Sequence, residues 1–390
     1  MIFNSLGSNY TFKFALNALV AVGNDGDNEE LKAYLEKRYQ GNAILLYKGR
    51  EAIKLALKLL NMPRNSRVGI TGLTCYAVYQ AVKEVGLKPV YLNINESLNF
   101  SADKVGDLKV LIVQNTLGNP CDVQSIHKIC KEKNIVLIED LAHSIGTIYK
   151  NGKEAGMVGD FTALSFSQDK AVDAISGGAL IIRNRRYLDS NLGQLKNVSL
   201  ATRLKDRFYP VLTFKIRNLY PYGLGKPFHF LLKNLNLLPR PVETDKSIVF
   251  HAMSNWHAKL AISSFKEFDS LLKHRREIAS VYVSNLDEKI QSRDYVDNIN
   301  LSSCLRFPIF IEKRQGLVNY LKEMGIFVSD VWYDAPIAPE KLLLKTDYNG
   351  ECPFSEKVSK NILNLPTHIN ISREGAEFIS KEINKWLNTK

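Results

Sequence analysis

The sequence predicts an α/β protein with a mostly parallel central sheet covered by helices, followed by a smaller C-terminal α/β domain. Short apolar segments recur through the first half, at residues 43–47, 67–71, 89–94, 110–115, 135–139, 161–166 and 179–183. Between them, residues 50–60, 76–85 and 122–133 show apolar side chains spaced three to four apart, as in helices. Continuous apolar runs are typical of strands that are buried on both faces. Strands alternating with helices predict a parallel sheet.

The length of 390 residues and the hydrophobic content of 45% are enough for one large and one small domain. We place the large domain at residues 1–250 and the small domain at residues 251–390. One long helical region, residues 254–286, leads into the small domain. Beyond it we expect strands at 305–311 and 327–333 and helices at 316–326 and 375–387.

Composition narrows the class of protein. The five cysteines are scattered, without a CxxC pair or metal-ligand spacing, which favours a reducing compartment and no metal site. We find no secretory signal and no apolar run long enough to span a membrane, so we expect a cytoplasmic protein. The net charge of +12 would suit nucleic acid, anionic lipid or a phosphorylated substrate. No zinc-finger, RNP-like or helix-turn-helix pattern is present, which disfavours sequence-specific nucleic-acid binding.

Three features lie near strand ends, where parallel sheets bind ligands. Asp140 ends an apolar strand and is costly there unless it meets a cation, although it could simply cap the next helix. Lys170 follows a strand that ends near Ser165; alone it would be an ordinary solvated lysine. Gly177 and Gly178 precede the last strand and alone would indicate a tight turn. Together they supply what pyridoxal 5′-phosphate (PLP) requires: a Schiff-base lysine, a carboxylate for the ring nitrogen, and phosphate donors.

The segments IEDLAHSIG and GDFTALSFSQDKAVDAISGGALIIRN resemble the DegT/DnrJ/EryC1/StrS family of PLP-dependent sugar aminotransferases. That family typically shows E-D-x-A-(Q/H)-x-x-G, then S-F-x-x-x-K, then G-x-G-G. The resemblance covers nearly the whole chain except residues 203–240. It implies a fold-type-I PLP-dependent transferase that acts as a homodimer. The implied reaction moves an amino group, from glutamate, to a keto group of a nucleotide-linked deoxysugar for polysaccharide or glycoside biosynthesis.

The resemblance assigns roles to individual residues. Lys170 would form the Schiff base and shuttle the proton, and Asp140 would pair with the ring nitrogen. His143 would lie near the ring's face or its phenolic oxygen; alternatively it is an ordinary helix-surface histidine. Tyr76 and Cys75 flank the position where the family often stacks an aromatic ring on the cofactor, and Tyr76 could instead be a core residue.

The phosphate would lie at the start of the helix that begins near Gly49, Arg50 and Glu51, whose backbone amides and dipole favour anions. Ser165 would donate a further hydrogen bond, or else only satisfy the strand end. Arg50 replaces the family's usual Thr or Ser, so it either pairs with the phosphate or points outward. Phe250 stands where the family has an Asn that reaches the neighbouring subunit's cofactor, which puts that contact in doubt.

Residues 203–240 depart most from the family. They hold eight basic residues against one acidic residue, a net charge of +7, with interleaved aromatics. One interpretation is a peripheral contact with an anionic membrane surface. The other, slightly favoured, is a lid or subunit contact whose apolar side packs against protein. Four prolines, at 210, 221, 227 and 239, predict that the segment is not one continuous helix.

Two other functions compete with transamination. The first is a PLP-dependent sugar dehydratase or lyase on the same fold, in which some relatives replace the lysine with histidine; the retained Lys170 disfavours it. The second is a non-catalytic relative that serves as a membrane-surface partner in glycan assembly. The intact Asp140 and Lys170 disfavour this role, whereas the missing Asn and the basic insertion favour it.

Overall fold

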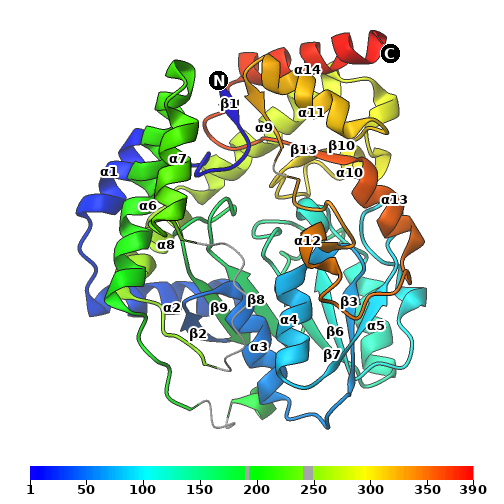
Figure 1. Ribbon diagram of the computed structural model, residues 1–390. Coiled ribbons are helices and arrows are strands. Elements are labelled where there is room, and N and C mark those ends of the chain that lie inside the picture. The colour runs from blue at the N-terminus through cyan, green and yellow to red at the C-terminus, as the bar shows by residue number, and fades with distance from the viewer. Residues whose placement is uncertain (189–192, 240–248, 330, 390) are drawn as a thin grey trace.

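A seven-stranded sheet organises the computed structural model, which describes residues 1–188, 193–239, 249–329 and 331–389 (Figure 1). The strand order is β2-β9-β8-β7-β6-β3-β5. Only β9 runs against its neighbours; the pairs β8–β7, β7–β6, β6–β3 and β3–β5 are parallel. All seven predicted strands are confirmed, with bounds within two residues. They are β2 (Asn42–Leu46), β3 (Arg67–Thr71), β5 (Lys88–Leu92), β6 (Val110–Gln114), β7 (Val136–Asp140), β8 (Phe161–Ser165) and β9 (Gly178–Ile182).

Helices cover both faces of this sheet because successive strand side chains point to opposite sides. On one face, β7 residues such as Ile138 pack with α3 (Gly49–Leu59) and α4 (Tyr76–Glu84). On the other face, Leu137 packs with α2 (Asp25–Tyr39), α5 (Val123–Glu132) and α8 (Asn255–Lys266). The predicted helices at 50–60, 76–85 and 122–133 correspond to α3, α4 and α5.

The predicted helical region at 254–286 is confirmed as helical, but it consists of two helices. The structure has α8 and then α9 (Phe268–Asn285), which meet at Glu267. The two helices pack in different places: Phe265 of α8 belongs to the core of the sheet, whereas Tyr282 of α9 belongs to a separate apolar core. The break lets one segment serve both cores.

The C-terminal part is built on β10 (Phe307–Phe310), which pairs antiparallel with β13 (Ile362–Leu365). Two short parallel pairs join it to earlier parts of the chain: β1 (Ile2–Phe3) with β11 (Ile326–Phe327), and β4 (Thr74–Cys75) with β12 (Ile337–Ala338). Its helices are α10 (Arg293–Asp297), α11 (Arg314–Glu323), α12 (Glu340–Leu343), α13 (Pro353–Asn361) and α14 (Arg373–Asn388), and the chain also has 3₁₀ turns at Ala102–Lys104, Thr116–Gly118, Arg185–Tyr187 and Glu288–Ile290.

The strand predicted at 327–333 is wrong over most of its length. Only Phe327 lies in a strand, and Asp330 lies outside the described residues. Trp332 and Tyr333 follow in a turn. Their rings contact His143, on the loop after β7.

The insertion folds into α6 (Leu200–Leu219), a 3₁₀ turn (Tyr220–Tyr222) and α7 (Gly225–Asn234); Arg240 lies outside the described residues. As predicted, it is not one helix, although Pro210 lies inside α6. Helix α6 packs beside α1 (Phe12–Val20), and Figure 1 shows α1, α6 and α7 together along one side of the molecule. Within the described residues, we find no helix with the length and apolar character needed to cross a membrane.

Candidate active site

Asp140 and Lys170 share one site at the carboxyl edge of the sheet. Asp140 ends β7 with 6% of its surface exposed, and its Oδ1 accepts the N–H of Ala142 at 2.9 Å. Burial raises the pKa of Asp140, whereas this hydrogen bond and the charge of Lys170 lower it. Burial lowers the pKa of the Lys170 amine, against the pull of Cys75 and Asp140. Burial therefore works against the charged form of both side chains, whereas the charge of each favours the charge of the other.

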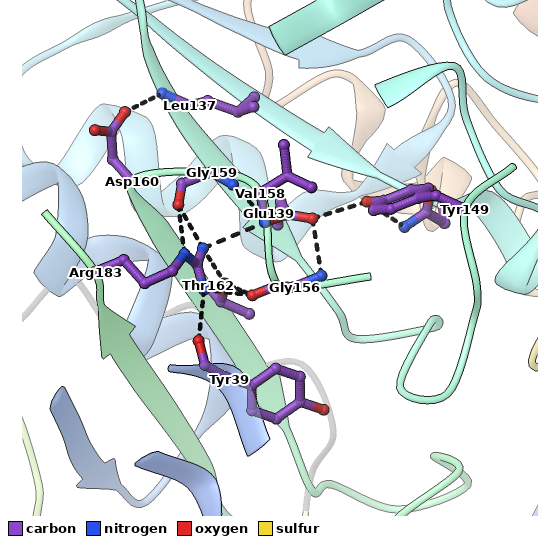
Figure 2. Close-up of polar contacts among 11 residues, drawn as sticks. Tyr39, Leu137, Glu139, Tyr149, Gly156, Val158, Gly159, Asp160, Thr162 and Arg183 are labelled. Atoms are coloured by element: carbon purple, nitrogen blue, oxygen red, sulfur yellow. Dashed lines mark hydrogen bonds and ion pairs between the residues drawn. The ribbon is translucent and has the colours of Figure 1, made fainter. Parts of the chain in front are cut away.

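The residue before Asp140 supports the site from the opposite face of the sheet. Glu139 is fully buried, and its two carboxylate oxygens accept hydrogen bonds from the loop between β7 and β8 (Figure 2). The donors are Tyr149 Oη at 2.8 Å, the backbone N–H groups of Gly156, Val158 and Gly159 at 2.8, 2.7 and 2.6 Å, and Arg183 at 3.4 Å. One buried side chain thus joins strand β7, this loop and strand β9.

The loop that carries Lys170 is held by Asp173 and by the start of the chain. The Asp173 carboxylate accepts the N–H groups of Asp169 and Ile175, both at 2.8 Å, and the hydroxyl of Tyr10 at 3.0 Å. Burial, reinforced by the Asp169 charge, raises the pKa of Asp173 to about 7. Asn9 donates its side-chain N–H to the carbonyl of Lys170 at 3.3 Å. The backbone on both sides of the lysine is therefore fixed.

Two stacked aromatic rings lie beside Lys170. Its Nζ lies 4.5 Å from the centre of the Trp332 ring, and the His143 ring stacks on the same indole at 5.0 Å. The hydroxyl of Tyr333 lies 2.9 Å from His143 Nδ1, and the N–H of Leu117 donates to that nitrogen at 3.4 Å. Since Nδ1 accepts, the proton of a neutral imidazole lies on Nε2.

Among the residues predicted to hold the phosphate, the glycines are packed too closely against their neighbours to carry a side chain. A Cβ atom on Gly49 would lie 2.6 Å from Cβ of Ser165, and one on Gly178 would lie 2.6 Å from the backbone nitrogen of Gly49. Gly49 is the first residue of α3, and Gly177, at φ +137°, pairs with Lys48. The N-terminus of an 11-residue helix therefore meets the ends of β8 and β9 beside Ser165. Such an end attracts anions.

Comparisons with known proteins agree with this geometry. The sequence model of the DegT/DnrJ/EryC1/StrS aminotransferase family matches residues 28–384. The chain belongs to this family. Among similar proteins, the GDP-perosamine synthase of Escherichia coli O157:H7 is 23% identical over 92% of this chain and 89% of its own length. The dTDP-3-amino-3,6-dideoxy-alpha-D-galactopyranose transaminase of Aneurinibacillus thermoaerophilus is 24% identical over 94% of this chain and 91% of its own.

Solved structures show the same fold. The putative sugar aminotransferase Spr1654 from Streptococcus pneumoniae, in its PMP-form, superimposes with a TM-score of 0.72 at 18% identity, covering 100% of this chain and 99% of its own. Helicobacter pylori PseC, an aminotransferase involved in the biosynthesis of pseudoaminic acid, has a TM-score of 0.71 at 17% identity, over 97% and 96%. Spr1654 also has a PLP-form with this fold.

Three predicted cofactor residues, Glu51, Tyr76 and Arg50, lie at the starts of α3 and α4. The Glu51 carboxylate accepts the backbone N–H of His251 at 3.0 Å and lies 3.0 Å from its Nδ1. Burial raises the pKa of Glu51, and these contacts with His251 lower it. Tyr76 is buried in the core beside Tyr79, as its alternative interpretation held, whereas its neighbour Cys75 acts electrostatically on Lys170. Arg50 is half-buried at the start of α3.

Several residues around Lys170 and His143 are absent from the site that the sequence predicts. The sequence predicts Trp332 and Tyr333 in a strand, and it does not indicate Arg306, which is 2% exposed with its guanidinium carbon 4.9 Å from the Trp332 ring centre. Asn9 and Tyr10 precede the matched part of the chain. The aromatic pair at 332–333 was the one available signal, because a polar turn is an unusual place for two large rings.

The residues present fit PLP. A half-buried lysine, a buried carboxylate within its electrostatic reach and a helix N-terminus with no room for side chains are the three groups that the cofactor needs. Within the described residues, no group of three His, Cys, Asp or Glu side chains is placed to hold a metal ion.

We predict that His143 stays neutral through about pH 6–8, the range in which an ordinary histidine titrates. Burial lowers its pKa well below the usual value, and the charges of Lys170 and Arg306 lower it further. Nitrogen-15 NMR of the histidine rings would show an unprotonated Nδ1 and a protonated Nε2 across this range. A titration midpoint inside it for the signal that His143→Gln removes would contradict the prediction.

Phe250 supplies a second prediction, on stability. Its side chain is 5% exposed and packs in the α3–α4 core, with Lys58 Nζ 5.2 Å from its ring centre. We expect Phe250→Ala to lower the free energy of unfolding by about 3–5 kcal/mol, because it removes a buried ring and leaves a cavity in the core. Urea denaturation measures this, with Phe378→Ala, whose side chain is 41% exposed, as the matched control. Equal effects of both variants would contradict it.

Proposed function

We propose that this aminotransferase uses PLP to move an amino group from glutamate to a keto group of a nucleotide-linked deoxysugar, in polysaccharide or glycoside biosynthesis. The observation that carries the proposal is that Lys170 and Asp140 lie within electrostatic reach of each other, with a glycine-lined helix N-terminus at the same edge of the sheet. The named relatives support the substrate class, since they act on GDP- and dTDP-linked sugars. The solved PLP-form and PMP-form of Spr1654 support the cofactor.

In this proposal, bound PLP supplies the electron sink that stabilises negative charge on the substrate carbon. Lys170 takes a proton from that carbon at its Nζ and returns it, and the burial that lowers its pKa keeps the amine ready to accept. Asp140 would pair with the ring nitrogen of PLP and keep it protonated. The positive charge of a protonated ring nitrogen would favour the charged form of the Asp140 carboxylate, as the charge of Lys170 does.

The remaining roles concern position. Tyr333 fixes the neutral His143 at Nδ1, so the N–H of His143 at Nε2 can donate a hydrogen bond. Gly49 and Ser165 would hold the phosphate at the start of α3, with Gly177 and Gly178 giving it room. Trp332 covers Lys170 on one side and excludes water from it. Glu51 contributes through His251 to the shape of this helix start.

We further propose a homodimer, on the ground of the family resemblance. Phe250 packs into the core of its own chain, and Ala252 bridges to Leu46 of β2. The side chain at position 250 therefore packs inside its own subunit and does not reach a neighbouring one. A dimer of this chain would complete its sites without the cross-subunit Asn of the family.

The location that we propose is the cytoplasm, at the inner face of a membrane, with peripheral contact through residues 203–240. The support is that α6 and α7 leave apolar and basic side chains exposed while burying one side against the protein. The packed-lid interpretation accounts for the buried side, which includes Tyr209 and Ile216, but not for the exposed one.

The test is amino transfer in two steps with purified protein. PLP should give the protein a visible absorption band that glutamate abolishes, with release of 2-oxoglutarate. Keto-deoxysugars linked to GDP, dTDP and UDP are then added, and mass spectrometry identifies the amino sugar. Loss of water from the sugar without amine gain would favour the dehydratase, and absence of the band would favour the non-catalytic partner.

A further inference from the structure

We infer that helices α1, α6 and α7 form one docking face for the anionic surface of a lipid bilayer. The inference names the partner for the peripheral location proposed above and rests on that proposal. The three helices are packed together: the rings of Phe12 in α1 and Phe214 in α6 lie 5.6 Å apart. Gly225 of α7 lies so close to α6 and the turn after it that a Cβ atom would be 2.6 Å from the Ile216 carbonyl oxygen.

Each helix exposes an apolar stripe. Phe12, Leu16 and Val20 recur every four residues along α1 and are all exposed. The same spacing recurs on α6, and α7 adds neighbouring leucines and a phenylalanine. The exposed apolar residues of α6, α7 and the turns beside them are Leu200, Leu204, Phe208, Tyr222, Leu224, Phe230, Leu231, Leu235 and Leu237. Apolar patches of this extent mark interaction surfaces.

The charges between these side chains are of one sign. Residues 11–22 and 199–238 contain a single acidic residue, Asp206. It is fully buried and accepts hydrogen bonds from Tyr47 at 2.7 Å and from His257 at 2.9 Å. The exposed charged side chains of these segments are Lys13, Arg203, Lys215, Lys226 and Lys233. An apolar surface with cations among its side chains matches lipid acyl chains and anionic head groups.

A second copy of the chain fits this face less well. Symmetric dimers usually pair a patch with itself, which would bring these lysines against one another. Like charges across an interface cost free energy. A bilayer containing anionic lipid offers both an apolar layer and negative charge. Since no described helix is suited to span it, the face would lie in the plane of the interface.

Vesicle sedimentation tests the inference with the full chain. We expect the protein to bind vesicles of phosphatidylcholine with phosphatidylglycerol, and to release them as salt is raised, but not to bind phosphatidylcholine alone. The double variant Phe230→Ser/Leu231→Ser, at positions 65% and 52% exposed, should bind at least about tenfold more weakly. The double variant Lys226→Gln/Lys233→Gln should lose roughly tenfold or more of its affinity for the vesicles with phosphatidylglycerol. Leu344→Ser, 98% exposed but outside the face, should bind like the wild type.

Either of two results would overturn it. One is wild-type protein that binds neither vesicle, or binds both equally. The other is a dimer, by light scattering, that Phe230→Ser/Leu231→Ser converts to monomer without a change in lipid binding, which would place a second copy on the face. Amino transfer from glutamate, measured in the same samples without lipid, reports separately on the proposed function.

Discussion

Replacing Lys170 with alanine is expected to lower the rate of amino transfer from glutamate by at least about 10⁴-fold, the upper end of what a general acid–base contributes. Lys170 is the only predicted residue whose nitrogen both faces the Trp332 ring and has a pKa lowered by burial next to Asp140. A variant without this amine should neither show the visible band with PLP nor move the substrate proton. Absorbance and single-turnover release of 2-oxoglutarate measure the two losses independently.

The matched control is Lys153→Ala. Lys153 is exposed on the loop between β7 and β8. Its removal should leave both signals intact. Near-normal turnover in Lys170→Ala, with the fold verified by circular dichroism, would show that another group carries the proton and would refute the assignment of the lysine.

Replacing Glu139 with alanine is expected to lower the free energy of unfolding by about 3–5 kcal/mol, the range for removing one partner of a buried ion pair. The loss leaves the N–H groups of Gly156, Val158 and Gly159 inside the protein without their acceptor, and Arg183 without its carboxylate (Figure 2). Urea denaturation followed by circular dichroism gives the change.

Two further variants define what Glu139 does. Glu139→Gln keeps the volume but turns an NH₂ group toward N–H donors, so it should still be clearly destabilising. Glu132→Ala, at an exposed position of α5, should change stability by less than about 0.5 kcal/mol. If Glu139→Ala were as mild as Glu132→Ala, the hydrogen bonds around Glu139 would not be a main support of the loop.

The sequence was sufficient for the sheet because most of its strands are buried on both faces, so they are mostly apolar runs. It was also sufficient to bring Asp140, Ser165 and Gly178 together, because β7, β8 and β9 are neighbours and these residues stand at the end of β7, the end of β8 and the start of β9. Lys170 lies five residues beyond β8, and its role comes from the family resemblance.

The contacts that sequence reasoning missed join distant parts of the chain. Tyr333 reaches His143 across 190 residues, and Glu51 reaches His251 across 200. No local periodicity encodes such pairs; the packing of the C-terminal part on the sheet creates them. The sequence left Cys75 and Tyr76 as alternatives because they are adjacent at the start of α4; Cys75 caps the helix and acts electrostatically on Lys170, whereas Tyr76 is buried beside Tyr79.

The first eleven residues connect the loop that carries Lys170 with helix α6. Asn9 and Tyr10 hold the lysine loop, and Arg217 of α6 donates to the carbonyl of Tyr10 at 2.8 Å. All of these residues except Arg217 precede position 28, where the family match begins. An expression clone trimmed to the matched region would keep every diagnostic motif, yet it would cut the tether between the insertion and the lysine. Gene boundaries for engineering this enzyme should therefore follow its contacts and not its motifs.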